Sequence, residues 1–272
     1  MLDLTPSASG LPGLALSEVS GVLLQFFFAM LRIGAFVLAA PLFAARFIPL
    51  QVRIVLTVCL ALPLMGRVPL PDPETLASTR AVVWALREMA LGLSAGLVLS
   101  ILFAIAVIAG DRIANTAGLG LAAQVDPNTG TQSPVIGQFF SLFLLAIFLS
   151  QDGHLAAIGL VLESYRLIPI AAPINGAELT GAGLDAAREM FAGAARVMMP
   201  VVGILLVLNI VIGVITRSAP QLNIFAFGFP LTMSATLVLL LLTATGLGAA
   251  FAALTDDALA RLAALFLGAA DG

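Results

Sequence analysis

The stretch MALGLSAGLVLSILFAIAVIA, residues 89–109, runs for 21 residues without a charge. As an α-helix it would be about 31 Å long, which matches the hydrocarbon core of a bilayer. A segment that crosses lipid must satisfy its backbone hydrogen bonds internally, and a helix does so without neighbouring strands. This stretch therefore predicts a membrane-spanning helix.

The composition of the whole chain agrees with that class. Of 272 residues, 61% are hydrophobic and only 10% are charged, and the mean hydropathy is +1.12. Soluble domains carry about 25% charged residues. The formal net charge of −3 argues against a basic surface for nucleic acid. We expect an all-α integral membrane protein.

Five further apolar regions differ widely in length. They span residues 19–40, 47–65, 135–149, 197–215 and 224–254. The region 135–149 is too short to cross a bilayer, whereas 224–254 would be roughly 46 Å long as one helix. Arg32 and Arg53 lie inside two of these regions, where an arginine costs about 3 kcal/mol and usually faces protein or water. We therefore expect long, broken helices, some of which rest on other protein chains.

Three segments outside these regions are expected to be connecting or terminal. Residues 66–79 and 168–183 are rich in proline or glycine and read as linkers. Residues 1–18 contain no basic side chain, so they do not form a secretory signal peptide. We expect them to be a flexible leader, and the linker 168–183 to separate two halves of the chain.

Gly92, Ser94 and Gly96 match the G-x-S-x-G pattern of hydrolase nucleophile elbows. That pattern needs a strand–turn–helix context and a histidine partner, for which His154 is the candidate because the chain has one histidine. The same glycines form a G-x-x-x-G pattern that lets helices approach closely, and this packing interpretation is favoured. His154 is then a polar residue at a helix break.

Acidic residues inside membranes often mark ion paths, but Glu88, Asp111 and Glu163 lie at the ends of apolar segments. A small-molecule or ion transporter would need a polar site at mid-membrane, where Arg32, Arg53 and Asn209 are the candidates. The single histidine and single cysteine do not supply the ligands of a zinc site. No metal or cofactor is expected, and Cys59 is expected to be buried in its apolar region.

The segment GDRIANTAGLGLAAQVDPNTGTQSPVIG, residues 110–137, combines glycines with apolar residues. Non-helical backbone at membrane depth is tolerated where it is buried in protein or lines water, so a loop in a pore is one interpretation. A short amphipathic helix at the membrane interface is the other. Composition does not separate the two.

The turn RSAPQLNIFAFGFPL, residues 217–231, is unusually polar and specific for a connection between two apolar regions. Pro220 disfavours helix at the preceding residue, and Gln221 and Asn223 can satisfy the freed carbonyls. A helical-hairpin turn at the membrane surface is one interpretation. The other is a turn held against a partner, with Arg217 as its charged anchor.

These residues resemble the FliR/SctT family, the export-gate subunits of type III secretion. The turn at 217–231 is similar to the family signature, and its GFPL ending is most like the flagellar branch. Three further matches follow in the family order: RIGAFVLAAPLFAARFIPLQVR (32–53), GDRIANTAGLGLAAQVDPNTG (110–130) and QDGHLAAIGLVLESYRLIP (151–169). The resemblance covers residues 20–255, nearly the whole chain.

The resemblance implies a non-enzymatic structural and gating subunit that assembles with FliP and FliQ. FlhB would dock on this complex, and FlhA would supply the surrounding export machinery. Unfolded flagellar proteins would cross the bacterial inner membrane in the flagellar basal body. The chain would comprise a FliP-like half (19–183) fused to a FliQ-like helical hairpin (184–272), part of a helical cone. The injectisome SctT counterpart is the alternative.

The resemblance also implies roles for individual residues. It places a plug within 117–130, inside the glycine-rich segment 110–137. The residues carried over to this plug or gating loop are Gly118, Gly120, Asp126, Pro127 and Gly130. Those carried over to the signature turn and its partner contact are Arg217, Pro220, Gln221, Asn223, Phe225, Gly228 and Pro230. The early motif supplies the structural anchors Arg32, Pro41, Arg46, Pro49 and Arg53.

Overall fold

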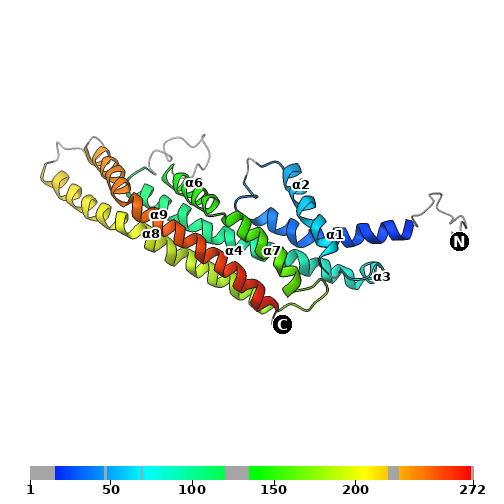
Figure 1. Ribbon diagram of the computed structural model, residues 1–272. Helices are drawn as coiled ribbons and strands as arrows, with labels where there is room; N and C mark the ends of the chain where they lie inside the picture. The colour runs from blue at the N-terminus through cyan, green and yellow to red at the C-terminus, as the bar shows by residue number, and fades with distance from the viewer. Residues whose placement is uncertain (1–15, 46–47, 69, 120–134, 220–226, 271–272) are drawn as a thin grey trace, which may run out of the picture. The chain divides into compact units, whose positions relative to one another are not determined.

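The computed structural model describes the chain except residues 1–15, 46–47, 69, 120–134, 220–226 and 271–272. The described parts are built from helices and contain no strand. In chain order the elements are α1 (Leu16–Ala39), α2 (Leu50–Ala61), the 3-10 helix η1 (Leu62–Gly66), α3 (Pro73–Leu76), α4 (Arg80–Thr116), α6 (Val135–Ser150), α7 (Gly153–Leu167), α8 (Gly176–Ser218) and α9 (Phe229–Ala270) (Figure 1). The all-α membrane class predicted from composition is confirmed.

Four of the described helices are long and apolar enough to cross a membrane, namely α1, α4, α8 and α9. The count becomes five if α6 and α7, separated by a break of two residues, together make one span. The broken pair corresponds to the apolar region that was too short to cross a bilayer by itself.

The long helices extend beyond the apolar regions that predicted them. α4 has 37 residues and α8 has 43, because alanine, glutamate and arginine outside the apolar runs are also good helix formers. α8 therefore begins at Gly176, inside the expected linker 168–183, and α1 begins at Leu16, inside the expected leader. The glycine-rich segment 110–137 likewise begins and ends as helix.

The start of α8 has a specific cap. The Asn175 side-chain oxygen accepts hydrogen bonds from the backbone N–H groups of Ala177 at 3.1 Å and Glu178 at 3.4 Å. This satisfies donors that have no partner inside the helix. Hydropathy does not reveal such a start, because the cap lies far from the apolar part of the helix.

The break between α6 and α7 lies at the Gly-His motif. Asp152 has a φ of 55°, a left-handed conformation that aspartate tolerates better than most residues. A Cβ atom on Gly153 would lie 2.5 Å from the Phe148 ring, so this glycine is required by packing. His154 follows directly in α7, and its prediction as a polar residue at a helix break is confirmed.

The chain divides into two compact units, each described here by itself. Unit 1 comprises Met1–Leu99, Leu155–Gly183 and Leu262–Gly272, and unit 2 comprises Ser100–His154 and Leu184–Arg261. In unit 1, α1 packs against α2 and α3, and its inner face is buried at Phe28, Ile33 and Phe36. Cys59 on α2 is exposed, contrary to the prediction, because α2 has an outer face that the described residues do not cover.

In unit 2, aromatic rings hold the helices together. The rings of Phe103 on α4 and Phe148 on α6 meet edge to face at 5.1 Å between centroids, and those of Phe140 on α6 and Phe251 on α9 do so at 5.6 Å. Such pairs contribute roughly 0.5–1.5 kcal/mol beyond their buried area. α8 and α9 lie side by side in this unit (Figure 1), and Arg261 of α9 contacts Glu189 of α8 at 3.6 Å.

Candidate functional site

Arg32 is completely buried in unit 1 and forms a bidentate ion pair with Glu88. Its Nε donates to Glu88 Oε2 at 2.9 Å and its Nη2 to Glu88 Oε1 at 3.0 Å. Nη1 donates to the Ser164 hydroxyl at 2.9 Å, and Nη2 also donates to the Ile168 carbonyl at 2.8 Å. The guanidinium, in a helix long and apolar enough to cross a membrane, therefore faces protein, as the cost of a charge in lipid requires.

Tyr165 completes this cluster. The Arg32 guanidinium carbon lies 4.2 Å from the centroid of the tyrosine ring, within the range of a cation–π contact. The tyrosine hydroxyl donates to the Ala29 carbonyl at 2.7 Å. The arrangement joins α1, α4 and α7 through polar groups that have partners, so its function in the isolated chain is to fix the positions of these helices.

The sequence reasoning missed three members of this cluster. Glu88 was placed at the end of an apolar region, but α4 begins eight residues earlier at Arg80, so Glu88 lies well inside the helix. Ser164 and Tyr165 were not singled out. Two signals pointed toward them: a buried arginine requires an acidic partner, and Tyr165 is the single tyrosine of the chain.

Gly92 and Gly96 place α4 directly against α1. A Cβ atom on Gly92 would collide with the Arg32 carbonyl oxygen, and one on Gly96 would lie 2.9 Å from the Phe36 carbonyl oxygen. Residues four apart share a helix face, so Gly92 and Gly96 meet Arg32 and Phe36 in matching register. The packing interpretation of this motif is confirmed, and Ser94 lies within a continuous helix rather than at an elbow.

The other residues of the early motif lie in or near the connection between α1 and α2. Pro41 is in the turn after α1, and Pro49 is the N-cap of α2. Arg53 donates through Nη2 to the carbonyls of Ala45 at 2.9 Å and Ile48 at 3.1 Å. These hydrogen bonds tie α2 to the connection that precedes it. Arg46 lies outside the described residues.

In unit 2, helices α8 and α9 hold the end of α4. The Asn209 side chain on α8 donates to the Thr116 carbonyl at 3.1 Å. The Thr232 hydroxyl on α9 donates to the next carbonyl, that of Ala117, at 3.0 Å. Thr116 is the last residue of α4 and Ala117 follows it, so both carbonyls lie at the helix end, where carbonyls have no partner within the helix.

Gly118 ends α4 in a conformation that suits glycine. Its φ is +84°, and a Cβ atom there would lie 2.5 Å from the Phe229 ring at the start of α9. The structure thus brings a glycine of the proposed plug segment into contact with a phenylalanine of the signature turn. The other plug residues, Gly120, Asp126, Pro127 and Gly130, lie outside the described residues.

Of the seven residues carried over to the signature turn, three are described. Arg217 is exposed in the last turn of α8, where its charge complements the helix dipole. Gly228 is buried, and Pro230 is exposed at the second position of α9, where proline is well tolerated. Pro220, Gln221, Asn223 and Phe225 lie outside the described residues.

The two helices at the ends of the glycine-rich segment 110–137 contact each other directly. A Cβ atom on Gly110 of α4 would lie 2.6 Å from the Gly137 Cα atom of α6, and one on Gly137 would collide with the Asp111 carboxylate. The backbones of α4 and α6 therefore touch six residues before α4 ends. The two helix ends that flank residues 120–134 have little freedom to separate.

No group of three or more histidine, cysteine, aspartate or glutamate side chains capable of holding a metal ion occurs in the described part of the chain. The polar groups with the most specific geometry are instead hydrogen-bonded between helices. Their arrangement positions helices and helix ends.

The chain matches the family model described as bacterial export proteins, family 1, over residues 23–258. It is 33% identical over 214 residues to the flagellar biosynthetic protein FliR of Pectobacterium carotovorum subsp. carotovorum, which covers 77% of this chain and 80% of that protein. It is 31% identical to the protein of the same name from Bacillus subtilis (79% and 84%). The surface presentation of antigens protein SpaR of Shigella sonnei is 27% identical over 157 residues, 57% of this chain and 59% of that protein.

An all-α membrane protein with these motifs and relatives defines a class, the integral membrane components of bacterial export systems. The chain belongs to family 1 of the bacterial export proteins, the FliR/SctT family. The resemblance identified from its sequence motifs is confirmed.

Proposed function

We propose that the chain is a structural and gating subunit of the flagellar type III protein export apparatus. With FliP and FliQ it would form the channel through which unfolded flagellar proteins cross the inner membrane, with FlhB and FlhA as further partners. The proposal follows from the family and from relatives named flagellar biosynthetic protein FliR. Its residues would act by packing and gating rather than by bond chemistry.

The single observation that carries the gating role is the contact between Gly118 and Phe229. It joins the segment in which the resemblance places a plug to the segment that carries the family signature. The hydrogen bond from Thr232 to the Ala117 carbonyl strengthens the same junction. A change at the signature turn would therefore be transmitted directly to the end of α4 from which the plug extends.

The exposure of the last two helices supports assembly with other subunits. In their most apolar windows only 17% of α8 and 11% of α9 is buried, compared with 56% of α4. Such surfaces need lipid or other protein chains to cover them. This agrees with a FliP-like half at 19–183 and a FliQ-like hairpin at 184–272, which we retain as proposals.

The injectisome counterpart SctT is the second candidate, favoured by the similarity to SpaR. Affinity purification of the full chain from native membranes separates the two. Co-elution of FliP and FliQ is the expected result. Co-elution of the injectisome subunits instead would support the second candidate, and recovery of the chain without any export subunit would overturn both.

Deletion of residues 117–130 tests the plug. We expect the complex to assemble and the membrane to become permeable to ions, because the deletion removes the segment proposed to fill the channel. Ion flux into vesicles containing the purified complex is the measurement. An assembled complex with unchanged permeability would refute the plug assignment while leaving the assembly role intact.

The signature turn is tested by Arg217→Ala and Asn223→Ala. If the turn docks on a partner, both variants should reduce the amounts of FliP and FliQ that co-purify with the chain. Arg80→Ala, which removes an exposed arginine at the start of α4, is the matched control. Full recovery of the complex from both test variants would limit the turn to a local hairpin.

A further inference from the structure

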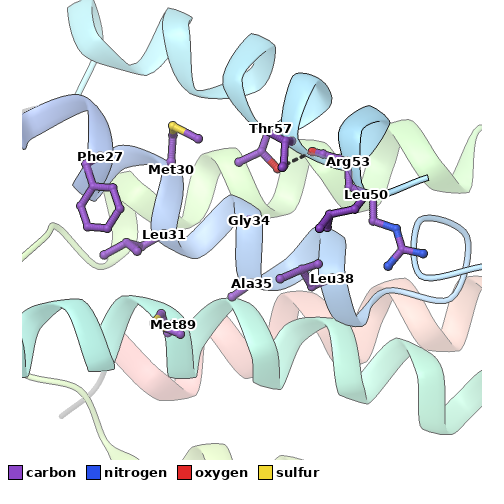
Figure 2. Close-up of a pocket in the computed structure, with 11 residues that line it drawn as sticks. Phe27, Met30, Leu31, Gly34, Ala35, Leu38, Leu50, Arg53, Thr57 and Met89 are labelled. Carbon is purple, nitrogen blue, oxygen red and sulfur yellow. Dashed lines mark hydrogen bonds between the residues drawn. The ribbon is translucent and has the colours of Figure 1, made fainter. Parts of the chain in front are cut away.

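An open apolar groove lies between α1 and α2 in unit 1 (Figure 2). Its volume is about 250 Å³. Several of the residues that line it are about half exposed, including Phe27 and Leu38 on α1 and Leu50 and Ile54 on α2. The groove is therefore open to the surroundings of the chain along one side. Its lining residues are Phe27, Met30, Leu31, Gly34, Ala35, Leu38, Leu50, Arg53, Ile54, Thr57 and Met89.

Arg53 is the single charged residue of this lining. Its Nη2 donates to two backbone carbonyls, but its Nε–H group is buried and has no acceptor among the residues that the structure describes. The nearby Thr57 hydroxyl donates to the Arg53 carbonyl at 2.8 Å. A buried donor without a partner is costly, and on a guanidinium it favours an anionic acceptor.

The groove has the dimensions of one membrane leaflet. Arg53, Leu50 and Leu38 lie at one end, and Phe27 lies at the other (Figure 2). Leu38 lies eleven residues after Phe27 along α1, a rise of about 17 Å at 1.5 Å per residue. Half of a hydrocarbon core is roughly 15 Å. An apolar groove of that length with a positive charge at one end matches a lipid acyl chain beneath its anionic headgroup.

The lining is apolar apart from Arg53 and Thr57, which suits a hydrocarbon chain that carries one anionic group. We propose that the groove binds one acyl chain of an anionic phospholipid, whose phosphate is held by Arg53.

Photolabelling of the full chain, purified with its co-eluting subunits into nanodiscs, tests the proposal. The probe is phosphatidylglycerol with a diazirine in one acyl chain, and labelled residues are mapped by mass spectrometry. We expect adducts on Met30, Leu38 or Ile54. Diacylglycerol with the same acyl diazirine lacks the phosphate and should label these positions about tenfold less, the change expected for the loss of one charge-assisted contact.

Variants distinguish the charge from the apolar groove. Arg53→Gln should lower labelling by phosphatidylglycerol about tenfold, whereas Arg80→Gln, at an exposed arginine outside the groove, should not change it. Gly34→Leu should block the groove, since a Cβ there already reaches ordinary contact with Thr57 at 3.4 Å. Leu38→Trp fills the groove from its exposed rim and provides a second blocking variant if Gly34→Leu does not fold.

Two results would overturn the proposal. The first is equal labelling by both lipids together with unchanged labelling of Arg53→Gln, which would reduce the groove to general lipid contact. The second is the absence of lipid adducts while a diazirine amino acid at position 38 cross-links to another subunit, which would make the occupant a protein. Lipid adducts that depend on both Arg53 and the open groove support it.

Discussion

Arg32 on α1 and Glu88 on α4 form a buried, bidentate ion pair with N–O distances of 2.9 and 3.0 Å. The same arginine donates to Ser164 and to the Ile168 carbonyl. A buried guanidinium of this kind is tolerated because each of its three nitrogens donates to an acceptor. Its main effect is to define one relative position for α1, α4 and α7.

Glu88→Ala should destabilise the protein by about 3–5 kcal/mol, because it leaves a buried guanidinium without its counter-ion. Unfolding of the purified protein in detergent, followed by circular dichroism, measures the loss. Replacing both partners, Arg32→Met with Glu88→Leu, should recover part of the stability, since no charge is then left unpaired.

The exposed pair Arg166–Glu163 is the control for this prediction. Its side chains are 64% and 55% exposed and the contact is 3.5 Å, so Glu163→Ala should have little effect on unfolding. Equal losses of unfolding free energy from Glu88→Ala and Glu163→Ala would show that the contribution of the Arg32–Glu88 pair to stability does not depend on its burial.

Gly92→Ala should also destabilise unit 1. The added Cβ atom meets the Arg32 carbonyl oxygen, and overpacking of this kind costs about 1–3 kcal/mol. Gly203→Ala in α8 is the matched control, because nothing lies within 4 Å of its Cβ position and alanine favours helix by up to about 1 kcal/mol. Thermal unfolding should therefore shift in opposite directions for the two variants, and a shift in the same direction would contradict the close contact of α4 with α1.

Ser94→Ala separates packing from catalysis at the same motif. Ser94 lies inside α4, between the two glycines that contact α1. We expect the variant to match the parent in assembly and in the proposed export function. An active-site serine probe that labels the parent chain, together with loss of function in Ser94→Ala, would revive a hydrolase role.

Loosening the end of α4 should change gating. Thr232→Val removes the donor to the Ala117 carbonyl, and Gly118→Ala introduces a side chain at a φ of +84° and against the Phe229 ring. Both variants should increase ion leakage through an assembled complex, because the proposed plug loses its anchor. Thr243→Val is the control, since the Thr243 hydroxyl bonds within its own helix at 2.7 Å to the Leu239 carbonyl. Leakage equal to that of the control would separate this junction from gating.

Asn209→Ala tests the neighbouring hydrogen bond by a measurement that does not depend on transport. Asn209 and Thr232 donate to consecutive carbonyls, those of Thr116 and Ala117. Each loss should cost about 1 kcal/mol and lower the hydrogen-exchange protection of the Ala117 and Leu119 amides by roughly fivefold. The double variant should depart from additivity because the two bonds hold one helix end. Unchanged protection in both single variants would mean that the end of α4 is held by other contacts.

Much of the class and family could be predicted from the sequence. Charge-free runs such as 89–109 predict helices because lipid leaves no other way to satisfy the backbone. The ordered motifs indicated the FliR/SctT family, and the Gly92/Gly96 spacing predicted a close helix contact. The helix ends were less predictable, since α4 and α8 continue into segments that are not apolar.

What the sequence by itself determined is the set of residues that cannot face lipid, Arg32 and Arg53 among them, because the cost of an unpaired charge depends only on residue type and surroundings. The tertiary structure alone decided which partners remove that cost. Glu88 and Ser164 are 56 and 132 residues from Arg32 in the chain, and helix packing brings them within 3 Å of it. The same holds for Gly118 and Phe229: the sequence shows a glycine and a phenylalanine, but only folding gives the glycine its left-handed φ and places the ring against it.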